Sequence, residues 1–200
     1  MTERVVADLS SLPLHGKGSA SPTWWGTLVF MLLEGSGFAL LIAVYLYLRS
    51  LAPSWPFGAP PPDVGPGIGV TLLLLVSLVP NYLVGRWAER EDLRKVRIGL
   101  VVMSVLGIAP LVVRGFEFAA LNISWDSNAY GSVIWVLLAL HTTHLITDVA
   151  DTLVLTAMMF TRHAPNPRRF GDVQDNVMYW NFVVLTWLPI YACLYGPSWL

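Results

Sequence analysis

Two histidines and two aspartates recur at helical spacing inside an otherwise apolar segment of this chain. They are His141, His144, Asp148 and Asp151, within SVIWVLLALHTTHLITDVADTLVLTAMMF. At roughly 100° per residue the four side chains fall within an arc of about 80°, so a helix places them on one face. Imidazole and carboxylate groups carry protons, make hydrogen bonds and bind metal ions. This polar stripe is therefore the first candidate for chemistry.

The composition indicates that the solvent around the polar stripe is a bilayer. Of the 200 residues, 55% are hydrophobic and 12% are charged, and the mean hydropathy is +0.60. An ionised group at mid-bilayer costs about 2.5–3.5 kcal/mol, so the stripe must face other helices, water or a partner subunit. A net charge of -1 argues against a nucleic-acid partner. The single cysteine, Cys193, cannot form an internal disulfide.

Five apolar stretches are long enough to cross a hydrocarbon core, which takes about 20 helical residues. The sequence therefore predicts an all-α, integral membrane bundle of five transmembrane helices, at approximately 24–49, 68–88, 96–116, 131–161 and 176–198. Residues 24–200 form the predicted transmembrane domain, and residues 1–23 a cytoplasmic N-terminal segment. The first 20 residues lack a continuous apolar run with a cleavage site, so no cleaved signal peptide is expected.

Lysine and arginine gather in alternate connections, which predicts the orientation. They occur before the first span, between the second and third, and between the fourth and fifth, as Arg4, Lys17, Arg86, Arg90, Arg94, Lys95, Arg97, Arg162, Arg168 and Arg169. The other two connections have none, although Arg49 and Arg114 flank them. The positive-inside rule therefore predicts a cytoplasmic N-terminus and an outside C-terminus. Arg86, Arg90, Arg168 and Arg169 are candidate contacts for anionic lipid headgroups.

Glu34 is a further ionisable group, about ten residues into the first span. At that depth a carboxylate is protonated, hydrogen-bonded to a neighbouring helix or on a water path. Together with the polar stripe it forms a candidate proton and polar network. On the fourth span, i,i+4 spacing lets His144 pair with Asp148. Asp148 and Asp151 lie toward the cytoplasmic end, where we expect contact with water near Arg162 or with a basic residue of a partner subunit.

Histidine and carboxylate groups also allow a metal hypothesis. Di-iron bundles distribute Glu-x-x-His motifs over two helices, whereas here one helix would supply every ligand except Glu34. A bis-histidine haem needs ligands from opposite sides, but His141 and His144 face the same way. We therefore predict no catalytic, cofactor or metal site in this chain. A stand-alone membrane transporter or metal-binding protein that uses the polar stripe stays open as an alternative, and so do plain interhelical hydrogen bonds.

The order and spacing of several motifs resemble subunit III of the haem-copper oxidase family, in its five-helix form. The similar residues are Trp25-Gly26 with Glu34, Trp55-Pro56, Glu117, Tyr130-Gly131-Ser132, the pair His141 and His144, and Tyr179-Trp180-Asn181-Phe182 with Trp187. They cover nearly all of residues 24–198. Asn181 stands where the family usually has histidine and Val184 where it usually has aspartate, while Asp148 and Asp151 occupy positions that are usually small or apolar.

The resemblance implies a non-redox accessory subunit of a haem-copper terminal oxidase, which reduces oxygen to water and pumps protons. It implies that partner subunits hold haem and copper, and that this chain binds beside the catalytic subunit I in the bacterial cytoplasmic membrane with phospholipid among its helices. Trp25, Glu117, Trp180 and Asn181 become candidate lipid or interface contacts. An accessory subunit of a nitric oxide reductase-type complex is the alternative within the same resemblance. The electron donor, cytochrome c or quinol, stays open because it binds elsewhere.

Overall fold

Five long helices make up most of the chain in the computed structural model, which describes residues 18–161 and 166–196. They are α1 (Pro22–Leu51), α2 (Val64–Glu89), α3 (Leu93–Ala119), α4 (Ala129–Met159) and α5 (Pro167–Tyr195), after a short 3₁₀ helix at Gly18–Ala20. The described ranges contain no strand. Each long helix is long and apolar enough to cross a membrane. The predicted all-α bundle of five transmembrane helices is therefore confirmed.

All five helices begin before the predicted apolar stretches, and α1, α2 and α3 also end after them, because caps and polar turns continue the backbone hydrogen bonds beyond the hydrocarbon; α4 and α5 end two and three residues early. α5 differs most, since it begins at Pro167 rather than at 176. The Asn166 side chain accepts a hydrogen bond from the Arg168 amide at 3.0 Å, and proline fits the first turn, where its missing N–H is harmless. α3 runs to Ala119, which brings Glu117 inside the helix. Residues 1–17 of the predicted N-terminal segment lie outside the described residues.

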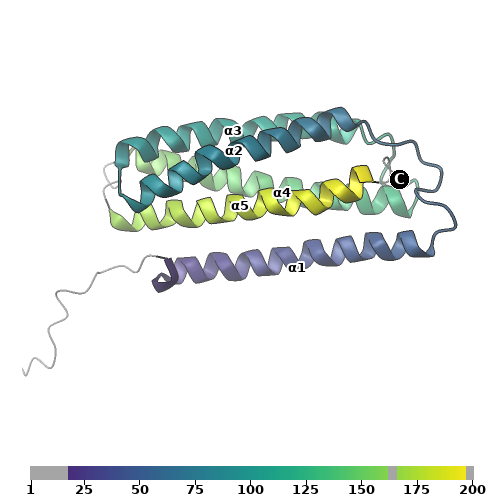
Figure 1. The fold of residues 1–200 in the computed structure, drawn as a ribbon, viewed down its shortest axis with the longest axis horizontal. Helices are drawn as coiled ribbons and strands as arrows, with labels where there is room; N and C mark the ends of the chain where they lie inside the picture. Colours follow the sequence, from purple (N-terminus) through teal and green to yellow (C-terminus); the bar gives the residue numbers. More distant parts are fainter. Residues whose placement is uncertain (1–17, 162–165, 197–200) are drawn as a thin grey trace, which may run out of the picture.

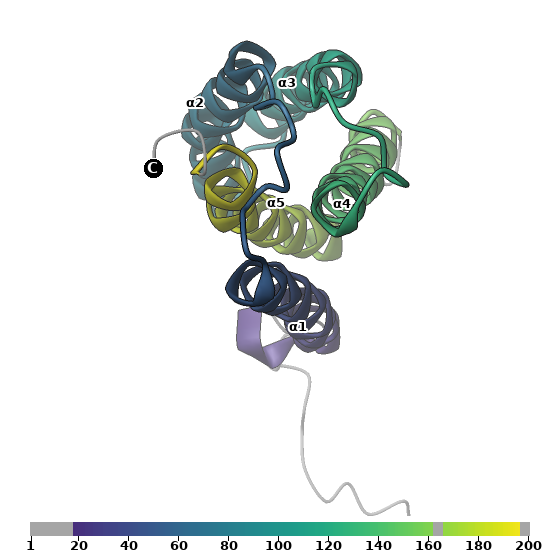
Figure 2. The ribbon, with the colours of Figure 1, turned by 90° about the vertical axis from the view of Figure 1, so that its right-hand side faces the viewer.

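The helices α2 to α5 pack around a common axis, and α1 lies outside this group (Figures 1 and 2). Among the long helices, α1 contacts only α4 and α5. Its fully buried side chains are Phe38 and Tyr45. Lipid removes most of the hydrophobic driving force for helix association. Close packing and interhelical hydrogen bonds must therefore hold α1 against α4 and α5. The polar contacts of α1 therefore matter for its position.

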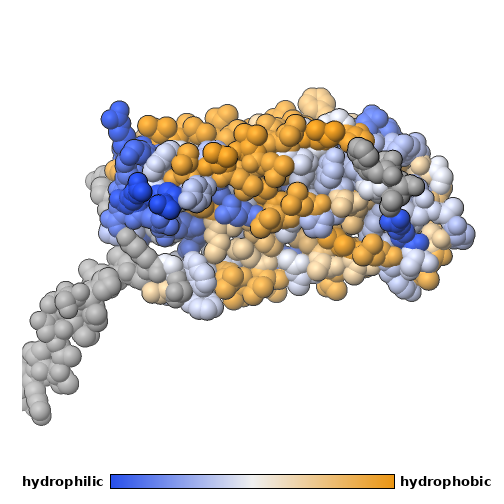
Figure 3. All heavy atoms as spheres, in the orientation of Figure 1, coloured by the Kyte–Doolittle hydropathy of each residue, from blue (hydrophilic) through white to orange (hydrophobic). Residues whose placement is uncertain are grey.

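On the face that Figure 3 shows, apolar residues dominate the middle of the bundle, between two more hydrophilic ends. On α1, large apolar side chains such as Leu32, Leu33 and Leu40 are exposed. This distribution matches a protein that lies in a bilayer. The direction in which the bundle crosses the membrane stays a prediction from the basic connections.

Two connections are fixed by side-chain contacts. At the start of α3, Asp92 caps the helix by accepting a hydrogen bond from the Lys95 amide, and the two side chains form an ion pair at 2.8 Å. The side-chain hydrogen bond of Lys95 lowers the pKa of the Asp92 carboxyl, so the cap is charged at neutral pH. In the connection between α1 and α2, the Trp55 ring packs edge-on against Tyr45 and Tyr130, which joins this loop to α1 and α4.

Candidate functional site: two buried polar networks

Glu34 on α1 contacts side chains from two other helices. Its Oε1 lies 3.0 Å from Nε2 of His144 on α4, and its Oε2 accepts a hydrogen bond from the Tyr179 hydroxyl on α5 at 2.7 Å. The Nδ1 atom of His144 lies 2.6 Å from the Leu140 carbonyl oxygen, which only accepts, so Nδ1 carries a hydrogen. One further proton is then shared between His144 and Glu34. This Glu34 network (Glu34, His144 and Tyr179) joins three helices and can move a proton between an imidazole and a carboxyl.

Asp148 and Asp151 share one amide donor on α5. The Nδ2 atom of Asn176 donates to Asp148 Oδ1 at 3.0 Å and to Asp151 Oδ2 at 3.1 Å. The predicted pair of His144 and Asp148 does not form in the described structure, because one ring nitrogen of His144 bonds its own helix and the other contacts α1. Asp148 is buried and Asp151 is exposed. Arg162, their expected neighbour, lies outside the described residues.

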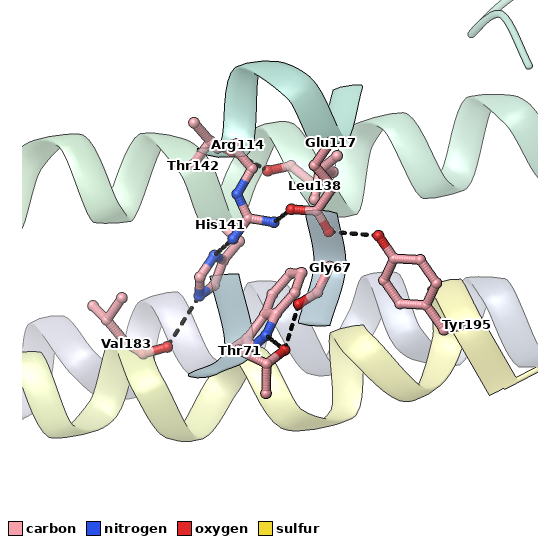
Figure 4. Close-up of polar contacts among 10 residues, drawn as sticks. Gly67, Thr71, Arg114, Glu117, Leu138, His141, Thr142, Val183 and Tyr195 are labelled. Carbon is pink, nitrogen blue, oxygen red and sulfur yellow. Dashed lines mark hydrogen bonds and ion pairs between the residues drawn. The ribbon is translucent and has the colours of Figure 1, made fainter. Parts of the chain in front are cut away.

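His141 belongs to a second buried network (Figure 4). Arg114 Nη1 lies 2.7 Å from Glu117 Oε2, and Arg114 Nη2 lies 3.1 Å from Nδ1 of His141. A guanidinium only donates, so this Nδ1 accepts and the imidazole is neutral, with Nε2–H donating to the Val183 carbonyl at 3.0 Å. The Tyr195 hydroxyl donates to Glu117 Oε1 at 2.7 Å. We call these four side chains the Arg114 network: Arg114, Glu117, His141 and Tyr195.

Aromatic and small residues close the Arg114 network on its other sides. The Arg114 guanidinium lies over the Trp187 ring, 4.1 Å from the ring centroid, a favourable cation–π geometry. Trp187 Nε1 donates to the Thr71 hydroxyl at 2.8 Å, and that hydroxyl donates to the Gly67 carbonyl at 2.7 Å. The Phe38 ring lies near both histidines and so packs between the two networks. The polar stripe is thus divided into parts with different partners.

Burial explains why the ion pair is so closely bonded, although the buried Nε of Arg114 makes no hydrogen bond with any described residue. Arg114 is 1% exposed and Glu117 is 0% exposed. A charge without a partner at such a depth costs several kcal/mol, and only close pairing with additional hydrogen bonds offsets this cost. The pair lies on one turn of α3 and is bonded to α4 through His141 and to α5 through Tyr195. We therefore assign the Arg114 network a structural part, as the polar connection among α3, α4 and α5.

The remaining candidate contacts lie in different environments. Trp180 is buried at 1% exposure and its Nε1 donates to Ser77 at 2.8 Å, so it packs in the core instead of facing lipid or a partner. Asn181 is exposed and accepts a hydrogen bond from Asn81 at 3.0 Å, while Trp25 is 53% exposed. Among the arginines, Arg86 pairs with Glu89 at 3.7 Å, Arg169 pairs with Asp172 at 3.0 Å, and Arg90 and Arg168 are exposed.

The sequence did not predict that Arg114 would be buried as the cation of the Arg114 network. Arg114 appears at the edge of the predicted third span, where it looks like a flanking residue. Its i,i+3 spacing to Glu117 was the available signal, because both become internal once α3 is extended by a single turn. The sequence did not mark Tyr179, Tyr195 and Asn176 as partners, because phenol and amide side chains carry no charge and so give no pattern that indicates burial next to a carboxylate.

The histidines have no ring nitrogen left for a metal in this arrangement. Both nitrogens of His141 and both nitrogens of His144 lie within hydrogen-bonding distance of protein atoms. In residues 18–161 and 166–196, no three His, Cys, Asp or Glu side chains lie close enough together to hold a metal ion. The two networks are therefore best described as hydrogen-bonded and ionic contacts.

A side chain at Gly67 is expected to disrupt the Arg114 network. A Cβ atom there would overlap the Tyr195 ring, whereas a Cβ at Gly65, on the same helix, meets nothing within 4 Å. We expect Gly67→Ala to displace Tyr195 from Glu117 and to lower the free energy of unfolding by about 1–3 kcal/mol, the usual cost of overpacking. Unfolding in sodium dodecyl sulfate measures this, with Gly65→Ala as the matched control. Equal stability of the two variants would contradict the close packing of Tyr195 on α2.

Comparison with known proteins agrees with this architecture. The family model described as cytochrome c oxidase subunit III matches residues 5–199. The cytochrome c oxidase subunit 3 of Synechocystis sp. is 26% identical, over 97% of this chain and 86% of the relative. That of Thermostichus vulcanus is 26% identical over 85% of each chain, and the probable cytochrome c oxidase subunit 3 of Mycobacterium tuberculosis is 28% identical over 85% of each. The chain therefore belongs to the cytochrome c oxidase subunit III family.

Proposed function

We propose that this chain is a non-redox accessory subunit of a haem-copper terminal oxidase in the bacterial cytoplasmic membrane. The observation that carries the proposal is the family match over nearly the whole chain, joined to five helices that can cross a membrane. Haem and copper then belong to the partner subunits, and the histidines of this chain serve hydrogen bonding. The names of the relatives favour an oxidase over a nitric oxide reductase, a transporter or a stand-alone metal-binding protein.

The proposed partner is the catalytic subunit I, and bound phospholipid is proposed around α1. Among the other long helices α1 contacts only α4 and α5, and it presents large apolar side chains such as Leu32 and Leu33 to its surroundings. Such a surface suits acyl chains or the apolar face of another membrane subunit. The exposed Arg90 and Arg168 are the arginines best suited to anionic headgroups.

The Glu34 network is proposed to hold and transfer protons for the complex. Tyr179 donates a hydrogen bond to Glu34, which contacts His144, and Tyr179 also lines a pocket that contains Asp148 and Asp151. A proton can pass from a donor in the pocket through the hydroxyl to the carboxyl, and then to the imidazole. His141 is a poor carrier because the Arg114 guanidinium occupies its accepting nitrogen.

Deletion and complementation test both parts of the proposal. A strain that lacks the gene is complemented with the natural chain, with Glu34→Gln, or with Glu89→Gln, whose carboxyl is exposed and paired with Arg86. We expect the deletion to shorten the period over which membranes sustain oxygen consumption. We expect Glu34→Gln to restore assembly and haem content but to slow proton uptake, because an amide does not exchange its proton in this way.

The outcomes separate the two parts. Unchanged oxygen consumption in the deletion strain would contradict the subunit assignment. Full proton uptake with Glu34→Gln, at normal haem content, would contradict the proton relay and leave the subunit assignment standing. Glu89→Gln is expected to match the natural chain in both measurements.

A further inference from the structure

A polar pocket lies between α1, α4 and α5, near the end of the bundle at which α5 begins. Its cavity volume is about 410 Å³, far more than the roughly 30 Å³ that one water occupies in the liquid. Carboxylates line one part of the wall and apolar side chains another. The residues that line it include Phe30, Asp148, Asp151, Arg169, Asp172 and Tyr179.

The acidic part of the wall contains an oxygen without a partner. Asp148 is 1% exposed, and its Oδ2 makes no hydrogen bond with any described residue. Its other oxygen and one oxygen of Asp151 both depend on the single amide group of Asn176. The pocket also contains Arg169, but this guanidinium is already paired with Asp172 at 3.0 Å. The carboxyl of Asp148 therefore lacks a compensating cation at a depth where an uncompensated carboxylate is costly.

The rest of the wall favours an organic cation over a metal ion. A hard metal ion takes about six oxygen ligands at short distance. Four aspartates line the pocket, but no three acidic or histidine side chains among the described residues lie close enough together to hold one metal ion. Phe30 and Tyr179 both line the pocket with their rings stacked at 5.9 Å, and aromatic faces attract ammonium groups. Val154, Leu155 and Met158 add apolar wall for a hydrocarbon stem. An ammonium group also supplies the donor that the unpartnered oxygen of Asp148 needs.

We propose that this pocket binds the ammonium group of a primary amine carried on an apolar stem, with Asp148 and Asp151 as its anionic partners. A lysine side chain of a neighbouring subunit and the headgroup of an amine-bearing phospholipid share this chemistry. Amine binding can be tested on the full chain without the partner subunits. If no amine binds, the proposed subunit role is unaffected.

The test uses n-butylammonium chloride on the purified full chain in an uncharged detergent. The melting temperature is recorded from tryptophan fluorescence with butylammonium, with butan-1-ol as the same stem without charge, and with sodium chloride at equal ionic strength. We expect a saturable rise in melting temperature with butylammonium alone, since a ligand that binds only the folded state stabilises it. The double substitution D148N/D151N is expected to abolish the rise. Asp126→Asn, at an exposed carboxylate in the connection between α3 and α4, is expected to retain it.

An equal response to butylammonium and butan-1-ol on the natural chain would overturn the proposal, and this comparison needs no variant to fold. A full butylammonium response in folded D148N/D151N would overturn it as well, because the carboxylates would then not be the binding groups. The molecule that supplies the amine is identified in the intact complex. A water-soluble carbodiimide joins a carboxyl to a contacting amine as an amide. Mass spectrometry of the product distinguishes a lysine peptide of another subunit from an ethanolamine headgroup.

Discussion

Replacing Arg114 by methionine is expected to lower the free energy of unfolding by about 3–5 kcal/mol, the usual result of removing one partner of a buried ion pair. The substitution keeps a long side chain over Trp187 but leaves Glu117, at 0% exposure, without its cation. The lost hydrogen bond to His141 contributes less, since interhelical hydrogen bonds in membranes average about 0.6 kcal/mol. The unpaired carboxylate therefore dominates the effect.

The double variant R114M/E117Q tests this cause. It removes both charges, and the glutamine still accepts a hydrogen bond from Tyr195 through its amide oxygen. We expect it to recover most of the stability that Arg114→Met loses, because replacing both charges of a buried pair is often close to neutral. Unfolding in sodium dodecyl sulfate, followed by circular dichroism, gives the three free energies. If the double variant is as unstable as the single one, packing of Arg114 rather than its charge is what stabilises the bundle.

Replacing Trp180 by alanine is expected to have the second large effect, lowering the free energy of unfolding by about 3 kcal/mol. This is the low end of the range for tryptophan in soluble cores. Lipid is as apolar as the core, so the transfer term is small and the cost comes from the cavity and the lost contacts. The indole is 1% exposed and bonds Ser77 on α2, so its removal loosens the contact between α2 and α5.

Trp125→Ala is the matched control for this substitution. Trp125 is 63% exposed in the connection between α3 and α4, and we expect its replacement to change stability by no more than about 0.5 kcal/mol. A second variant, Trp180→Phe, keeps an aromatic ring but removes the donor to Ser77, and we expect an intermediate loss. If Trp180→Ala behaved like Trp125→Ala, Trp180 would lie at a lipid or subunit surface, as the motif resemblance suggested.

The number and order of the helices were predictable because a bilayer imposes a simple rule. Every backbone group must be bonded internally, so apolar runs of sufficient length become helices. The helix ends were less predictable, since they depend on caps and polar turns. Asn166 and Pro167 start α5 well before its apolar stretch begins, and the last turn of α3 carries Glu117 into the core.

The residues of the candidate site were partly predictable, because an ionisable side chain costs free energy inside a bilayer. Their partners were not predictable. Glu34, His141, His144 and Asp148 are ionisable groups inside apolar spans, so sequence alone marks them. Which side chain meets which depends on helix packing, and this packing joins His144 to α1 and His141 to α3. One helix face thus supplies two networks with different chemistry: a neutral imidazole held by an arginine, and an imidazole that shares a proton with a carboxyl.

The composition of the complex that this chain forms in its native membrane is the most direct test of the subunit assignment. The tagged chain is purified in mild detergent, its companions are identified by mass spectrometry, and the reduced-minus-oxidised visible spectrum is recorded. The subunit assignment predicts haem bands that arrive with a large, many-helix subunit, while the chain separated from that subunit is colourless. A solitary chain that carries no haem-bearing companion would contradict it.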